Sequence, residues 1–228
     1  MTDVSTLGGG YAESDPDPGP TVAAVLAAAR SGGPDAHLIV LGGPPATGKS
    51  SVAARLVQLI PNALWIDKDA SAGGFIVEAA RCQGLPASAA YGTDQYWQAL
   101  RPLEYSGAMA LACANLVDNR VVFLVGGWGP ELAVQPLWPD LGRLLAPSRL
   151  TVVHLDAPAP EAWRARMRAR GSRSDSPWFE EFAAAVTRLP VWEGASRIPT
   201  GGPLAEVVQR VMDELDRGDS PVMRSGSY

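Results

Sequence analysis

The sequence feature that most limits the possible fold is a short loop between an apolar run and a helical pattern. The loop, GPPATGKS at residues 43–50, matches the pattern G-x-x-x-x-G-K-[ST] in full. It follows the apolar run HLIVLG at 37–42 and opens directly into a predicted helix over 49–60. In that setting glycines let backbone N–H groups turn toward phosphate oxygens, and the helix N-terminus adds partial positive charge. The loop therefore predicts a nucleotide-phosphate site.

This motif also predicts the cofactors. We expect Lys49 to reach the β- and γ-phosphates of ATP, and the hydroxyl of Ser50 to ligate Mg²⁺. ATP and Mg²⁺ are therefore the predicted cofactors. The residues predicted to bind the nucleotide are Gly43, Pro44, Pro45, Ala46, Thr47, Gly48, Lys49, Ser50, Ser51 and Arg166.

The rest of the chain alternates between short apolar runs and helical patterns. Continuous apolar strands separated by helices indicate a parallel sheet covered on both faces. We predict the α/β P-loop NTPase fold, with a five-stranded, mostly parallel sheet and an arginine-rich lid. The expected strands are residues 37–42, 63–67, 120–127, 149–157 and 196–200. The expected helices are residues 21–33, 49–60, 74–83, 94–118, 160–170 and 203–216.

Two acids follow the second predicted strand, in the stretch WIDKDAS. In an extended segment Asp67 and Asp69 point to the same side, at the carboxyl end of a strand, where such sheets bind ligands. One acid can help to hold hydrated Mg²⁺, and the other can accept a proton from an attacking hydroxyl. The alternative is a pair of solvated loop acids, which are common at strand ends.

Five arginines crowd the stretch WRARMRARGSR. Arg166, Arg170 and Arg173 are spaced i, i+4 and i+7, which places them on one face if the segment is helical. Such a face can close over ATP as a lid and neutralise charge on the transferred phosphoryl group. The alternative is a solvated basic face.

The remaining sequence narrows the class of P-loop protein. No N-K-x-D loop for reading guanine is present. The third predicted strand ends FLVGGWG, without the acidic pair that motor-type ATPases carry there. Neither a GTPase nor a motor is therefore predicted.

Together these elements resemble the P-loop small-molecule kinases. The greatest similarity is to chloramphenicol phosphotransferase and related predicted kinases, with shikimate kinase and the kinase half of polynucleotide kinase further away. The resemblance covers residues 37–215 and rests on the P-loop, the acid pair and the pattern R-x-x-x-R-G-x-R at 166–173. It implies that Asp69 is the general base toward the acceptor hydroxyl and that Asp67, with Ser50, serves the magnesium. Lys49, Arg170 and Arg173 complete the predicted catalytic set.

The same resemblance includes the stretch RPLEY but implies no role for Arg101, Glu104 or Tyr105. One departure concerns the acceptor. Chloramphenicol phosphotransferase has acids at the end of its third strand, where this chain has Gly126 and Gly127 followed by a tryptophan. Chloramphenicol is therefore not carried over as the substrate.

Aromatic residues suggest the nature of the acceptor. The segment that follows the second strand is expected to build the acceptor pocket, and an aromatic lining suits a drug-sized natural product or another bulky, partly apolar molecule. The alternative is that each aromatic belongs to the core. The aromatics concerned are Phe75, Tyr91, Tyr96, Trp97 and Tyr105, with Trp65 and Trp128 near strand ends.

The predicted function is an ATP- and Mg²⁺-dependent phosphotransferase acting on a hydroxyl of a small molecule, such as an antibiotic or another natural product. Two alternatives stay open. A zeta-toxin-like kinase would phosphorylate a nucleotide sugar and shares the I-D-x-D stretch. A regulatory protein would bind ATP without catalysis.

Composition bears on partners and location. The chain has 228 residues and a net charge of −5, which disfavours a nucleic-acid partner. No apolar run is long enough to span a membrane and no secretory signal is present, so we expect a cytoplasmic protein. The domain prediction is a disordered segment 1–20, a kinase domain 21–216 and a flexible tail 217–228.

The side chains most often used for zinc or redox chemistry are scarce. The two cysteines, Cys82 and Cys113, are expected to be buried free thiols, and no cysteine–histidine cluster suits zinc. The two histidines, His37 and His154, are expected to be structural.

Overall fold

The computed structural model describes residue 7 and residues 16–219. The elements are α1 (Gly19–Ala28), β1 (His37–Gly42), α2 (Lys49–Leu59), β2 (Ala63–Asp67), α3 (Lys68–Cys82), a 3₁₀ turn (Ala87–Ala89), a π-helical turn (Tyr96–Leu100), α4 (Arg101–Ala114), β3 (Val121–Val125), a 3₁₀ turn (Pro130–Ala133), α5 (Leu137–Leu145), β4 (Arg149–Asp156), α6 (Pro160–Ala169), α7 (Trp178–Arg188), β5 (Ser196–Pro199) and α8 (Leu204–Asp219).

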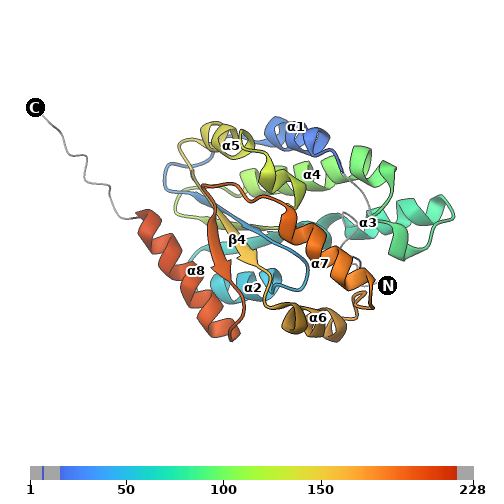
Figure 1. Ribbon diagram of the computed structural model, residues 1–228. Coiled ribbons are helices and arrows are strands. Elements are labelled where there is room, and N and C mark those ends of the chain that lie inside the picture. The colour runs from blue at the N-terminus through green and yellow to red at the C-terminus, as the bar shows by residue number, and fades with distance from the viewer. Residues whose placement is uncertain (1–6, 8–15, 220–228) are drawn as a thin grey trace, which may run out of the picture.

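The five strands form one parallel sheet in the order β2-β3-β1-β4-β5. Helices α1, α4 and α5 cover one face, and α2 and α8 cover the other (Figure 1). The predicted fold class is therefore confirmed. All strands end at the same edge, so the loops that follow β1, β2, β3 and β4 converge there.

Strand β1 shows why the sheet is covered twice. Its side chains alternate between the two hydrophobic clusters: Leu38 and Val40 pack on the α1/α4/α5 side, and Ile39 and Leu41 pack on the α2/α8 side. All four are fully buried. Four consecutive apolar residues pack against both faces in turn, as expected for a central strand of a parallel sheet.

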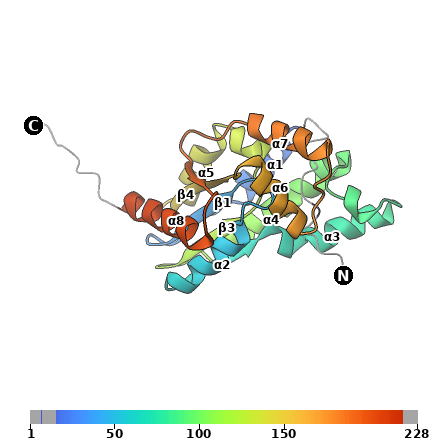
Figure 2. The same cartoon turned by 60° about the horizontal axis from the view of Figure 1, so that its bottom comes forward.

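Helices α6 and α7 form a separate small layer near the carboxyl ends of the strands and, in both views, lie at the same end of the molecule as α3 (Figure 2). Trp163 and Met167 of α6 pack against Trp178 and Phe182 of α7. The Trp163 indole N–H also donates a 2.8 Å hydrogen bond to the Pro45 carbonyl, which ties α6 to the P-loop.

Several predicted boundaries are corrected. Helix α3 begins at Lys68, not at residue 74, and α1 spans Gly19–Ala28, not 21–33. Helices α5 and α7 are not predicted from the sequence. Of the segments predicted to be disordered or flexible, residues 1–6, 8–15 and 220–228 lie outside the described residues, whereas α8 runs through to Asp219.

Candidate active site

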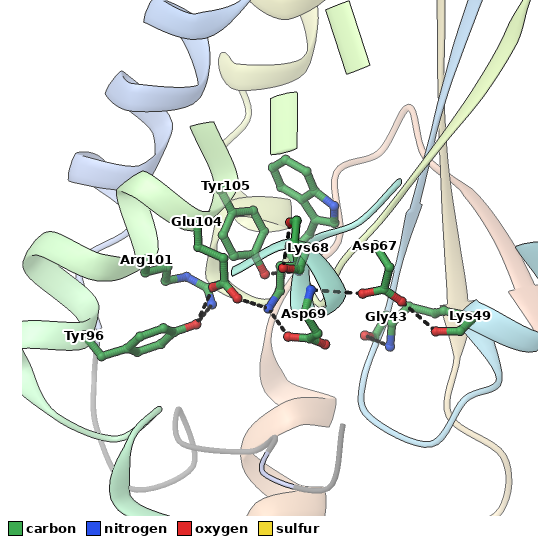
Figure 3. A network of polar contacts seen from close by, with 12 residues as sticks. Gly43, Lys49, Asp67, Lys68, Asp69, Tyr96, Arg101, Glu104 and Tyr105 are labelled. Atoms are coloured by element: carbon green, nitrogen blue, oxygen red, sulfur yellow. Dashed lines mark hydrogen bonds and ion pairs between the residues drawn. The ribbon is translucent and has the colours of Figure 1, made fainter. Parts of the chain in front are cut away.

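A cavity of about 570 Å³ opens at the carboxyl edge of the sheet. One end, which we call the nucleotide end after the ligand predicted for it, is formed by the P-loop, the last turn of α6 and the segment around the start of α8. The other, which we call the acceptor end for the same reason, is formed by the aromatic segment before α4, by α4 itself and by the loop after β3. Asp67, Lys68 and Asp69 lie between the two ends (Figure 3). One cavity therefore joins most of the residues singled out in the sequence.

The P-loop has the backbone that its glycines predict. Gly43 has φ of +135°, and a Cβ there would collide with the carbonyl oxygen of Leu155. Gly48 has φ of +92° and caps the N-terminus of α2. Both positions favour glycine because left-handed conformations strain residues with a side chain. The first two loop residues, Gly43 and Pro44, do not line the cavity, whereas residues 45–51 do.

Lys49 is held by the loop itself. Its ammonium donates to the carbonyls of Gly43 (2.8 Å) and Pro44 (2.7 Å). Burial, reinforced by the nearby Arg170 guanidinium, lowers the Lys49 pKa to about 7, against the opposing pull of Asp69 and Asp67. Within the described part of the chain, no carboxylate lies within ion-pair distance of Lys49 or Arg170. The nucleotide end is thus a site of gathered, unneutralised cations, which suits phosphate.

The two predicted magnesium ligands meet. The Ser50 hydroxyl donates to Asp67 Oδ2 at 2.8 Å. Mg²⁺ typically takes one or two protein oxygens and completes its shell with water and substrate phosphates. No group of three or more His, Cys, Asp or Glu side chains in the described ranges could hold a metal alone. The donors present therefore fit an Mg²⁺ that arrives with a nucleotide.

The geometry predicted for the acid pair is wrong, although both acids do reach the cavity. Asp67 is the last residue of β2 and the N-cap of α3, where its Oδ1 accepts a 3.0 Å hydrogen bond from the Asp69 backbone N–H. Asp69 lies in the first turn of α3, not in an extended segment. The cap explains the early start of the helix, because a side-chain oxygen satisfies a backbone donor that would otherwise be unpaired.

Asp69 is paired with a residue that the sequence analysis passed over. Lys68 Nζ contacts Asp69 Oδ1 at 2.7 Å and Glu104 Oε1 at 2.8 Å, and its side chain is only 7% exposed. Burial would raise the Asp69 pKa, but the Lys68 ammonium, with Lys49 and Arg170 beyond it, holds that pKa below its ordinary value. Asp69 is therefore ionised at neutral pH. Among the described residues none donates a hydrogen bond to its other oxygen, Oδ2.

The polar contacts continue into α4, as Figure 3 shows. The Tyr96 hydroxyl donates a hydrogen bond to Glu104 Oε2 at 3.0 Å. The Arg101 guanidinium donates two hydrogen bonds, of 2.8 and 2.6 Å, to the carboxylate of Glu131. Arg101 also donates to the Tyr96 oxygen at 3.0 Å. A usable sequence signal exists for Arg101 and Glu104, since their i, i+3 spacing predicts one helix face. Nothing in the sequence pattern points to Glu131.

Of the three arginines predicted to form a lid, two line the cavity and one does not. Arg166 lines it and donates to the Thr200 carbonyl at 2.8 Å, and Arg170 lines it as the C-cap of α6. Arg173 lies in the loop beyond α6, where its Nε donates to Asp175 at 3.1 Å, and it is not among the cavity-lining residues. The expected single face is not formed because the helix ends at Ala169, before Gly171 with its φ of +78°.

The aromatics divide between cavity, core and surface. Four line the cavity, namely Tyr91, Tyr96, Trp97 and Tyr105. Trp128 is a buried core residue whose backbone N–H donates to the Tyr105 hydroxyl at 3.1 Å. Phe75 and Trp65 are exposed. Gly126 and Gly127 line the cavity.

The histidines and cysteines lie outside this cavity. His37 is buried and contacts the Thr151 hydroxyl at 2.8 Å, and burial with the nearby Arg149 lowers its pKa to about 4. His154 contacts Asp156 at 2.7 Å. Both cysteines are free, but Cys82 is exposed and Cys113 is half-buried, so the expectation of two buried thiols is wrong.

Comparisons with solved structures place the fold. The chain is similar to a gluconokinase from Sinorhizobium meliloti 1021, with a TM-score of 0.52 and 18% identity over 82% of this chain and 94% of that one. It is similar to a shikimate kinase from Bacteroides thetaiotaomicron, with a TM-score of 0.51 and 18% identity over 78% of this chain and 98% of that one. No protein-family model and no curated protein sequence matches it. At this identity the likeness shows that the fold is shared, an α/β fold with a P-loop and a five-stranded parallel sheet.

None of the helices that the structure describes is both long enough and apolar enough to cross a bilayer.

Proposed function

We propose that this protein transfers the γ-phosphoryl group of ATP, with Mg²⁺, to a hydroxyl group of a small molecule. One observation carries the proposal: a single cavity holds a P-loop with its lysine and Ser50–Asp67 pair at one end, an ionised carboxylate midway, and an aromatic-lined space at the other. A protein that only binds ATP has no need for a carboxylate facing a second, aromatic compartment.

The nucleotide end supplies binding and charge. Backbone N–H groups of the P-loop and the N-terminus of α2 would hold the phosphates, and Lys49 would leave its two carbonyl partners to meet them. Ser50 and Asp67 would contribute oxygens to Mg²⁺. Arg166 and Arg170, at the end of α6, would face the nucleotide from the opposite wall.

Asp69 is the proposed proton acceptor. When the acceptor oxygen bonds to the γ-phosphorus and the bond to the β,γ-bridging oxygen breaks, ADP leaves with the bridging oxygen and the hydroxyl proton needs a base. Asp69 Oδ2 would take that proton, while Lys68 fixes the carboxylate through Oδ1. Arg170 would stabilise charge that develops on the transferred group.

The test is a panel of hydroxylated metabolites and natural products incubated with ATP and Mg²⁺ and read by mass spectrometry for the gain of one phosphate. The Lys49→Ala variant is the matched control, and only the wild type should form product. If the wild type binds ATP yet phosphorylates nothing across a broad panel, the regulatory alternative is favoured. Phosphorylation of nucleotide sugars alone would favour the toxin-like alternative.

A further inference from the structure

The acceptor end contains two buried cations, and the charge of each is already neutralised by this chain. The Arg101 side chain is 6% exposed, and its fork is occupied by Glu131, whose side chain is fully buried. Its guanidinium lies between aromatic faces, 4.3 Å from the ring centre of Tyr105 and 4.6 Å from that of Trp97. A planar fork that is already bidentate cannot offer the same geometry to a substrate carboxylate.

Lys68 is neutralised in the same way. Its ammonium bridges Asp69 and Glu104, and it lies 5.1 Å from the ring centre of Tyr105. Asp69, Glu104 and Glu131 therefore face Lys68 and Arg101, so among these five residues, with Lys49 and Arg170 of the nucleotide end not counted, carboxylates outnumber cations by one. An anionic ligand would add a second negative charge in a poorly solvated place, which is strongly unfavourable.

The unsatisfied groups at this end are neutral donors. The Tyr91 hydroxyl and the Trp97 indole N–H are buried without a hydrogen-bond partner among the described residues, and the two residues are only 7% and 6% exposed. Both residues line the cavity, although the two donor atoms themselves are almost fully covered, so a ligand reaches them only when the side chains turn toward it. Buried donors without partners are uncommon in native structures, and a ligand that brings acceptor atoms removes the cost.

We propose that the phosphate acceptor is an uncharged, ring-bearing alcohol with neutral hydrogen-bond acceptor atoms, and that Glu104 and Glu131 exclude anionic acceptors by occupying Lys68 and Arg101. This inference rests on the proposed function, and it adds the acceptor's chemical class. The rings pack against Tyr91, Tyr96 and Trp97, and carbonyl or ether oxygens accept from the Tyr91 and Trp97 donors once these side chains turn toward the ligand. Specificity at the acceptor end therefore depends both on excluding anionic acceptors and on binding the rings of uncharged ones.

The test is equilibrium binding of matched probes to the full chain with Mg²⁺ and a non-hydrolysable ATP analogue. The probes are 4-(hydroxymethyl)benzamide and 4-(hydroxymethyl)benzoate, together with the corresponding naphthalene pair. The amides should bind roughly tenfold or more tightly than the carboxylates, because like charges repel in a poorly solvated site. The inference would be overturned if the carboxylates bound as tightly as the amides or more tightly. It would also be overturned if none of the four probes bound.

Two variants sharpen the test. Tyr91→Phe should weaken amide binding roughly tenfold, since it removes one donor from a buried site, and leave binding of the ATP analogue unchanged. Glu131→Gln releases the Arg101 fork and should shift preference toward the carboxylate. A Glu131→Gln protein that is folded by circular dichroism and still prefers the amide by the wild-type ratio contradicts the role given to Glu131.

Binding is measured without turnover, so the two proposals fail separately. Amides that bind but never gain phosphate would contradict the proposed function and support this inference. Phosphorylation of the carboxylate probes would support the proposed function and contradict this inference.

Discussion

The two ends of the cavity treat charge in opposite ways. At the nucleotide end the ammonium of Lys49 donates to two backbone carbonyls and, among the described residues, forms no ion pair, and burial lowers its pKa to about 7. At the acceptor end Lys68 and Arg101 are each fixed by carboxylates. The first arrangement stores unfavourable charge that a polyanion can relieve, and the second is complete without a ligand. The comparison teaches that buried cations alone do not mark an anion site, because what matters is whether the chain has already neutralised them.

The largest effect on kcat should come from removing Lys49, the cation whose charge the nucleotide phosphates would neutralise. Lys49→Ala should lower kcat by about 10³-fold or more, because the transferred phosphoryl group loses its nearest point charge. Steady-state kinetics with any accepted alcohol measures the loss. Turnover within tenfold of the wild type would remove Lys49, and the P-loop with it, from the chemistry.

Stability should respond in the opposite order. Glu131→Gln should reduce the free energy of unfolding by about 3 kcal/mol, because it leaves Arg101 as a buried, unpaired charge. Lys49→Ala should cost less than about 1 kcal/mol, since the fold already disfavours that charge. Urea unfolding without nucleotide measures both, and equal losses would erase the proposed contrast between the two ends.

The arginines beyond α6 provide a matched pair. Arg170→Ala should lower kcat by roughly 10- to 100-fold with a smaller effect on ATP binding, because it faces the cavity near Lys49 and Asp69. Arg173→Ala should change kcat by less than about threefold, since Arg173 lies outside the cavity in a solvent-exposed ion pair with Asp175. Similarly large losses of kcat in both variants would support the single basic face expected from the sequence and contradict this distinction.

The smallest predicted effect is on the pH dependence of nucleotide binding. With a pKa near 7, Lys49 is protonated below that pH and neutral above it, so affinity for an ATP analogue is full in mildly acidic solution and falls as pH rises. The Kd should increase roughly tenfold between pH 7 and pH 8.5. Lys49→Arg is the control, because arginine stays charged and its Kd should change little over this range. A flat wild-type profile would show that the lysine charge is not depressed.

The sequence predicts the nucleotide end better than the acceptor end. The reason is the separation along the chain between the residues that contact one another at each end. The P-loop could be read because its backbone, lysine and serine are contiguous and the strand and helix around it are local patterns. The acceptor end depends on pairs far apart in the chain, 36 residues between Lys68 and Glu104 and 30 between Arg101 and Glu131. Glu131 lies in a 3₁₀ turn after β3, with no periodicity to mark it.

Two local signals mark helix boundaries that differ from those expected. An aspartate at the end of a strand is a strong N-cap, which could have placed the start of α3 at residue 68. Gly171 after a run of arginines is a common helix terminator, which could have separated Arg173 from Arg166 and Arg170.

The central claim is that Asp67 serves the metal and Asp69 serves the acceptor. Metal titration of kcat in Asp67→Asn and Asp69→Asn, at saturating ATP, tests it most directly. Asp69→Asn should lose roughly 10²- to 10⁴-fold in kcat with ATP binding intact and no recovery at high Mg²⁺ or Mn²⁺, because the proton acceptor is gone. Asp67→Asn should need more Mg²⁺ and recover part of its rate when Mg²⁺ or Mn²⁺ is raised, since Ser50 still provides one ligand. An Asp69→Asn enzyme rescued by metal, beside an inactive and metal-insensitive Asp67→Asn, would contradict the account.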